Sequence, residues 1–163
     1  MDSDLTLDFI IIIVLIIANG LFSMTELAIV NAKKRKLEEL AESGNERAKT
    51  AFELSENPNE MFSTIQIGIT LVGILTGLYS GATFSSPLEE ILVSNIPSIE
   101  PYAASVSSFI IVAIITYLSL VIGELVPKRL ALNRPESIAV LVAKPSYWLS
   151  VALKPIVSFL GVS

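Results

Sequence analysis

The fold of this chain is decided by one stretch, Ile122-Gly123-Glu124-Leu125-Val126-Pro127-Lys128-Arg129, which closes an apolar run that begins at Phe109. A carboxylate at that depth costs about 2.5–3.5 kcal/mol on membrane-insertion scales. We therefore expect Glu124 to be protonated, paired or bound to a cation. Because Pro127 has no N–H and crowds the preceding turn, carbonyl groups around Gly123 are free to face an ion. In the alternative interpretation, the helix ends early and Glu124 extends toward Arg129.

The composition is that of an integral membrane protein with few spans. Of the 163 residues, 52% are hydrophobic, the mean hydropathy is +0.68, and the apolar residues come in blocks. The sequence contains neither cysteine nor histidine. This excludes disulfides, thiol chemistry, histidine-ligated zinc and imidazole acid–base catalysis. Hard cations bound through oxygen stay possible.

The apolar blocks predict an all-α protein that forms one domain over residues 1–163. Three transmembrane helices are expected, over residues 5–32, 59–81 and 102–126. The first block starts with acidic residues, unlike a signal peptide, so we expect it to stay as an uncleaved helix. In it, Asn19, Ser23 and Glu26 share one helical face. That face is expected to point into the bundle, because polar groups that face lipid are costly.

Small residues characterise the second block, in which Gly73, Gly77 and Gly81 form two consecutive GxxxG steps. Such steps let another helix approach closely. The approaching helix belongs either to the same chain or to a second copy. The sequence leaves both possibilities open.

The segments outside the spans are expected to be helical or short. Residues 33–57 predict a cytoplasmic, charged helical hairpin that turns at Gly44. Residues 82–101 predict an outer loop with a short helix over Pro87–Asn95. Residues 135–162 are apolar but contain two Lys-Pro pairs, so three short helices at the cytoplasmic interface are favoured over a fourth span.

Charge is segregated along the chain. All eleven Lys and Arg residues fall within residues 33–49 and 128–154, whereas residues 1–8 and 82–101 carry only acids. Basic residues favour the cytoplasmic side of a membrane. The sequence therefore predicts that the N-terminus lies outside and the C-terminus in the cytoplasm.

Three spans would bring two acids, Glu26 and Glu124, together with neutral oxygen groups. The neutral candidates are Asn19, Ser23, Ser63, Thr64 and the carbonyl of Gly123, with Gln66 as a further one. A pocket of oxygen ligands with a net negative charge suits Mg2+ or Na+, and it would equally suit an organic ammonium. No nucleophile motif accompanies the two carboxylates, so an enzyme is not expected. A nucleic-acid partner is not expected either.

Three motifs occur in order along the chain: Leu21-Phe22-Ser23-Met24-Thr25-Glu26-Leu27-Ala28, Gln66-Ile67-Gly68-Ile69-Thr70-Leu71-Val72-Gly73 and Gly123-Glu124-Leu125-Val126-Pro127-Lys128-Arg129. In this order they make the chain similar to the membrane domain of the CorC/CNNM family, whose members are often called hemolysin-like proteins with CBS domains. The resemblance covers essentially the whole chain.

The resemblance implies a homodimer in the inner membrane, formed through the second and third transmembrane helices. It also implies Mg2+ export driven by Na+ entry, and cytoplasmic CBS domains that we expect to have been removed from this chain. The ion ligands that it implies are Ser23, either Ser63 or Thr64, the carbonyl of Gly123, and Glu124. Possible additional ligands are Glu26, Asn19 and Gln66.

The second motif departs from many Mg2+-transporting members, which carry Gly-Asn-Thr there. Ile69 stands at that Asn position, and Gly73 stands where a second Asn often lies. The chain is closer to a Gln-Ile-Gly subgroup, which resembles a bacterial polyamine exporter as well as Mg2+ exporters. Three functions therefore stay open: Mg2+ efflux, export of putrescine or cadaverine, and a sensor or scaffold that transports nothing.

Overall fold

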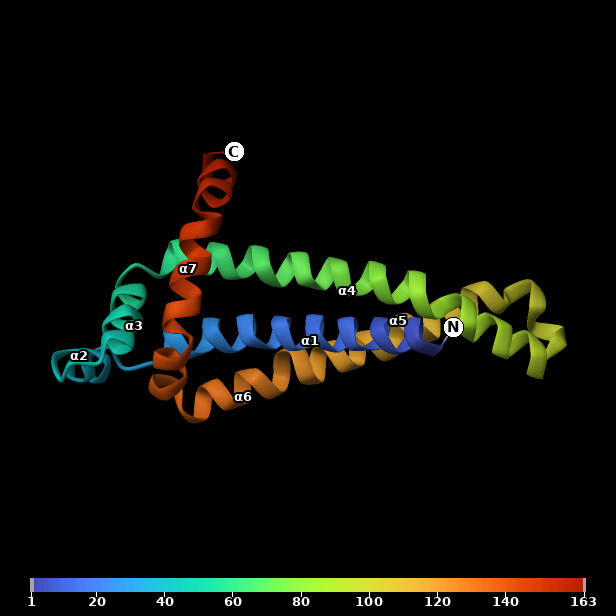
Figure 1. Ribbon diagram of the computed structural model, residues 1–163, viewed down its shortest axis with the longest axis horizontal. Helices are drawn as coiled ribbons and strands as arrows, with labels where there is room; N and C mark the ends of the chain where they lie inside the picture. Colours follow the sequence, from blue (N-terminus) through green and yellow to red (C-terminus); the bar gives the residue numbers. More distant parts are fainter. Residues whose placement is uncertain (1, 163) are drawn as a thin grey trace.

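The computed structural model describes residues 2–162, and these contain helices but no strand (Figure 1). The elements in chain order are α1 (Asp2–Asn31), α2 (Lys34–Glu42), α3 (Glu46–Glu56), α4 (Pro58–Asn95), the 3-10 helix η1 (Pro97–Tyr102), α5 (Ala103–Leu120), the π-helical turn η2 (Val121–Leu125), α6 (Val126–Asn133) and α7 (Pro135–Val162). The segment from α5 through η2 to α6 forms one continuous rod.

Three helical rods are long and apolar enough to cross a membrane: Asp4–Asn31, Pro58–Asn95 and Pro97–Asn133. They confirm the prediction of an all-α protein with three membrane-spanning helices. In Figure 1, α1 lies between α4 and α6 at the end of the rods near α7, whereas α5 packs mainly against α4 further along the rods. Large apolar side chains point outward from the rods, and Phe109, for example, is 74% exposed. Such a surface is suited to lipid rather than water.

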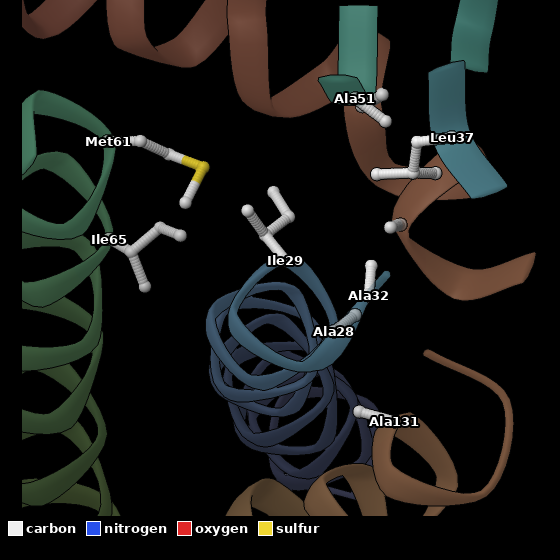
Figure 2. Close-up of a cluster of buried hydrophobic side chains, with 10 residues drawn as sticks. Ala28, Ile29, Ala32, Leu37, Ala51, Met61, Ile65 and Ala131 are labelled. Atoms are coloured by element: carbon white, nitrogen blue, oxygen red, sulfur yellow. The ribbon is translucent and has the colours of Figure 1, made fainter. Parts of the chain in front are cut away.

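The buried core lies at the end of the rods where α2, α3 and α7 gather (Figure 2). Figure 2 shows Ala28, Ile29 and Ala32 at the end of α1, with Met61 and Ile65 of α4 on one side. The remaining members of this cluster are Leu37, Ala51, Ala131, Ala139 and Ala143. Because so many members are alanines, α7 is able to pack closely across the end of α1.

The predicted outer loop over residues 82–101 is wrong in its first part. The structure continues α4 without a break through Pro87 to Asn95, and only the short helix η1 then leads into α5. A proline inside a helix removes one backbone hydrogen bond. Here α4 packs against both η1 and α5, and this packing offsets the loss of that bond.

The prediction of three short helices over residues 135–162 is also wrong, because α7 is one helix that contains both Pro145 and Pro155. It runs across the rods and bends along its length (Figure 1). Its contacts with α1, α3 and α4 account for this continuity despite the two prolines. α7 lies beside the end of the bundle, and it is not one of the three helical rods that are long and apolar enough to cross a membrane.

Ion pairs attach α7 to the helices beneath it. Glu136 at its start lies 3.8 Å from Lys36, Lys144 lies 3.7 Å from Glu46, and Lys154 lies 3.6 Å from Glu60. The hairpin below has the predicted turn, since Gly44 adopts φ +98°. Beyond it, the side chain of Asn45 accepts hydrogen bonds that cap α3.

The glycine face of α4 is open. A Cβ placed on Gly73, Gly77 or Gly81 meets no atom within 4 Å among the described residues. The possibility that these glycines serve packing within the chain is therefore wrong. Whatever covers this face lies outside the single chain.

Candidate functional site

The site is built where the third rod changes its helical pitch. A π-helical turn covers Val121–Leu125, so the main chain widens just before Pro127. In a regular helix the N–H of residue 127 would bond to the carbonyl of Gly123, but proline has no N–H. The Gly123 carbonyl therefore lacks the main-chain donor that it would have in a regular helix.

Glycines allow α1 to approach this turn closely. A Cβ on Gly20 would lie 2.9 Å from Cγ of Pro127 and 3.2 Å from the carbonyl oxygen of Ile122. A Cβ on Gly123 would lie 3.2 Å from the side-chain nitrogen of Asn19. The 2.9 Å separation is shorter than a real Cβ contact allows, and the two 3.2 Å separations are tight. Glycine is therefore favoured on both sides of this helix crossing, and most strongly at Gly20.

Asn19 fills the gap that Pro127 leaves. Its Nδ2 donates a hydrogen bond of 3.1 Å to the carbonyl oxygen of Gly123. Its Oδ1 is buried and has no hydrogen-bond partner among the described residues. An unpaired buried acceptor is unusual and needs a reason. Beside Gly123, the Asn19 Oδ1 atom is an oxygen available to a cation.

Ser23 and Glu26 continue the polar face of α1, one turn and two turns beyond Asn19. Ser23 is almost fully buried, with 2% of its surface exposed, and Glu26 is half-buried. The face thus points into the bundle at Ser23. Within residues 2–162, Glu26 forms no ion pair.

Glu124 is paired with Lys128 and not with Arg129. The Lys128 ammonium donates to Oε1 of Glu124 at 2.6 Å, and the two side chains are 33% and 41% exposed. A lysine four residues after a glutamate is at the spacing that favours such a pair on a helix. Arg129 is five residues after Glu124, so in a regular helix the two side chains point about 140° apart. The alternative interpretation is correct that Glu124 pairs with a basic side chain, but the partner is Lys128 and not Arg129.

The candidates on α4 lie elsewhere in the single chain. Thr64 is buried, donates to the carbonyl of Glu60, and lies 3.4 Å from the Ser150 hydroxyl of α7. Ser63 is exposed and donates to the carbonyl of Asn59. Among residues 2–162, no Cα atom of α4 lies within 8 Å of one in η2 or α6. The structure therefore does not bring Ser63 or Thr64 beside Glu124.

An apolar groove with one polar edge separates α4 from the end of α7. Its volume is about 540 Å3. Ser63, Gln66 and Thr70 form the polar edge, and Val157 and Leu160 are among its apolar walls. Gln66 is thus part of this groove, in a different place from Asn19 and Glu124.

Sequence reasoning missed two members of this site. Gly20 provides the close approach to Pro127, and Lys128 pairs with the acid. The i to i+4 spacing of Glu124 and Lys128 was a usable signal for the last. Nothing local identified Gly20, because its role depends on which helix crosses it.

Comparison with known proteins agrees with this architecture. Residues 10–163 match the family described as the cyclin M transmembrane N-terminal domain. This chain belongs to that family. The finding confirms the family resemblance of the three motifs, and it places the cyclin M transmembrane fold over nearly the whole chain.

Several relatives of this cyclin M domain are longer proteins. The chain is 50% identical over 161 residues to UPF0053 protein sll0260 of Synechocystis sp., covering 99% of this chain and 36% of the relative. It is 33% identical over 160 residues to UPF0053 protein YugS of Bacillus subtilis, covering 98% and 37%. It is 31% identical over 149 residues to the polyamine export protein of Escherichia coli K12, covering 91% and 33%. The chain thus spans about a third of the length of the curated relatives it matches.

Proposed function

We propose that this chain is the membrane domain of a cation transporter whose cargo binds at Glu124. One observation carries the proposal: a half-buried carboxylate on a π-helical turn, next to a carbonyl that a proline has freed and an asparagine oxygen that has no partner among the described residues. An ionisable group inside a membrane span marks a functional site by default. Deviations to π geometry are frequent at such sites.

Mg2+ is the first candidate cargo. The candidate oxygen groups at the turn are the Glu124 carboxylate, the Gly123 carbonyl and Asn19 Oδ1, with the buried Ser23 hydroxyl one turn along α1. Mg2+ keeps several of its waters and needs only one or two carboxylates from a protein. Such a partly hydrated ion would be held loosely enough for release. Na+ entry would drive its efflux.

A polyamine such as putrescine is the second candidate, and a specific observation favours it. Glu124 already binds an alkylammonium group, that of Lys128, with good hydrogen-bond geometry. Ile69, at the position of a family asparagine, packs against the apolar core, and Gly73 lies on the open face. Support also comes from the Escherichia coli relative, which is named a polyamine export protein.

The assembly and orientation belong to the same proposal. A second copy would cover the face of Gly73, Gly77 and Gly81, which is open in the single chain. Basic residues gather at the end of the rods that bears α2, α3 and α7, so that end would face the cytoplasm of an inner membrane. The remainder of a full-length protein would contribute CBS domains beyond α7.

Binding to the purified protein in detergent tests the cargo. Titration calorimetry with Mg2+, Na+ and putrescine should give saturable binding of at least one cation, and Glu124→Gln should abolish it. The variant keeps the side chain's size and removes its charge. If Glu124→Gln binds the cation as well as the parent protein, Glu124 is structural and the proposal is wrong.

Flux separates a transporter from a sensor or scaffold. Proteoliposomes that contain the parent protein should release or take up the cation that binds, and those with Glu124→Gln should not. Binding without any flux would instead favour a sensor that passes the state of the membrane to a cytoplasmic domain.

A further inference from the structure

We infer that the ammonium of Lys128 is a built-in competitor at Glu124, which a cargo cation has to displace in order to bind. This inference rests on the proposed function and adds to it a residue that controls access to the site. Lys128 would lower the affinity of the site for a cation, and a cation would bind only when the ammonium has moved away from Glu124. Lys128 is not one of the candidate ligands, and its presence in the third motif does not by itself imply such a role.

The geometry of the pair is the first step. Lys128 Nζ lies 2.6 Å from Oε1 of Glu124, a short distance that is typical of a charge-assisted hydrogen bond. The two side chains are 33% and 41% exposed, so the pair is partly shielded from its surroundings. The carboxylate is thus already neutralised by a protein group.

The neighbouring oxygen group is engaged in the same way. The Gly123 carbonyl accepts a hydrogen bond from Asn19 Nδ2. Both groups of the Gly-Glu pair therefore already bind N–H donors of the chain, an amide and an ammonium. A cation that binds here exchanges partners with these donors.

Charge repulsion favours the exchange at Glu124. If a cation joined the carboxylate while the ammonium of Lys128 stayed, two positive charges would lie within a few ångströms in a medium of low dielectric constant, where like charges repel strongly. The ammonium has a way out, because α6 lies at the basic end of the rods. A lysine has a flexible four-carbon stem and can extend toward the membrane surface.

Removal of the competitor should strengthen binding. We expect Lys128→Met to bind Mg2+ and putrescine about threefold or more tightly than the parent, since even a partly exposed ion pair weakens a competing equilibrium by roughly this factor. Arg129→Met is the matched control. It removes the same charge from the next residue, which is exposed and forms no ion pair within the described residues, so its affinity should stay close to the parent value.

A chemical rescue tests the competitor in one protein. The chain has no cysteine, so Lys128→Cys introduces a single thiol. Unmodified, or capped as the methyl disulfide with methyl methanethiosulfonate, this variant should bind like Lys128→Met. Treatment with 2-bromoethylamine converts the thiol to a side chain of lysine length with a terminal ammonium, and the affinity should return to the parent value.

The outcomes separate the two proposals. Tighter binding by Lys128→Met, reversed by aminoethylation of Lys128→Cys, supports the inference. Affinities that stay unchanged or fall in both Lys128 variants, while Glu124→Gln abolishes binding, overturn the inference and leave the proposed function standing. Undiminished binding by Glu124→Gln overturns both. Should Lys128→Met fail to fold, Lys128→Gln takes its place under the same criteria.

Discussion

The side-chain amide of Asn19 donates a hydrogen bond to the main-chain carbonyl of Gly123, and this bond joins α1 to η2. The two residues lie 104 positions apart in the sequence. The carbonyl is free to accept this bond because Pro127, four residues later, has no N–H. A local defect of the third rod is thus repaired by a side chain of the first. The same contact places the candidate site at the crossing of α1 and η2.

Loss of this hydrogen bond should destabilise the protein. Asn19→Leu keeps a similar volume but leaves the Gly123 carbonyl without its donor, which costs about 1–3 kcal/mol for a buried group. The free energy of unfolding in detergent measures the effect. Asn31→Leu is the control, because Asn31 is exposed and its amide bonds only to the carbonyl of Leu27 in its own helix. Equal losses in the two variants would show that the Asn19 bond has no special weight.

The close crossing of α1 and η2 should not tolerate a methyl group. Gly20→Ala places a Cβ 2.9 Å from Pro127 Cγ, and such overpacking typically costs about 1–3 kcal/mol. The unfolding midpoint should fall accordingly. Gly161→Ala, where the new Cβ meets nothing within 4 Å, should leave the midpoint unchanged or raise it slightly. A stable Gly20→Ala protein would contradict the packing described here.

The attachment of α7 to the start of α2 should depend on pH through Glu136. Burial opposes the charged form of this carboxyl, but hydrogen bonds from its own N–H and that of Lys33, together with the charge of Lys36, hold its pKa below its ordinary value of 4.5. A lowered pKa means that the charged form is stabilised on folding. This contribution is complete above about pH 4.5 and is lost as the pH falls through the lower pKa of the folded protein.

The measurement is the difference in free energy of unfolding between the parent and Glu136→Gln, as a function of pH. The difference should be present at pH 7 and shrink in acid. Glu53→Gln, at an exposed glutamate without an ion pair in the described chain, should show no such trend. A constant difference across the range would refute a role for the charge of Glu136.

The open glycine face predicts an effect on assembly alone. Gly77→Leu has room in the single chain, since no described atom lies within 4 Å of the new Cβ. If a second copy covers the face, the substitution should weaken the dimer, which light scattering in detergent detects, with the helix content of the chain unchanged. A dimer of unchanged mass would exclude this face as the interface.

Orientation is testable because the chain contains no cysteine. Ser98→Cys in η1 and Ser43→Cys after α2 both place a thiol at an exposed position, at opposite ends of the rods. A reagent that does not cross the inner membrane should label the cysteine at position 98 in intact cells and label that at position 43 only after lysis. Labelling of position 43 in intact cells would reverse the proposed topology.

Much of the fold was predictable from the sequence. Hydropathy blocks identified three spans, and Gly44 identified the turn of the hairpin. The prolines misled, because Pro87, Pro145 and Pro155 suggested breaks that the structure does not have. The free-energy cost of a proline inside a helix is limited, and packing against neighbouring helices offsets it. That packing is not visible in local sequence.

The site was predictable only in part. Asn19, Gly123 and Glu124 were named from the sequence because polar groups and a proline stand out in an apolar run, and the structure joins Asn19 to Gly123. Ser63 and Thr64 lie toward α7, since the direction of a side chain on α4 depends on how that helix is rotated about its axis. Hydropathy alone does not determine such a rotation when both lipid and protein surround a helix.

By itself, therefore, the sequence determined the number of spans, the segregation of charge and the presence of a costly acid near Pro127, because these depend on composition and near-neighbour spacing. Only the tertiary structure decided that Asn19 binds the Gly123 carbonyl, that α1 separates α4 from Glu124, and that one continuous α7 crosses the end of the bundle. These three features arise from contacts between helices far apart in the chain. Such contacts depend on helix rotation and on close approach at glycines, which no local pattern specifies.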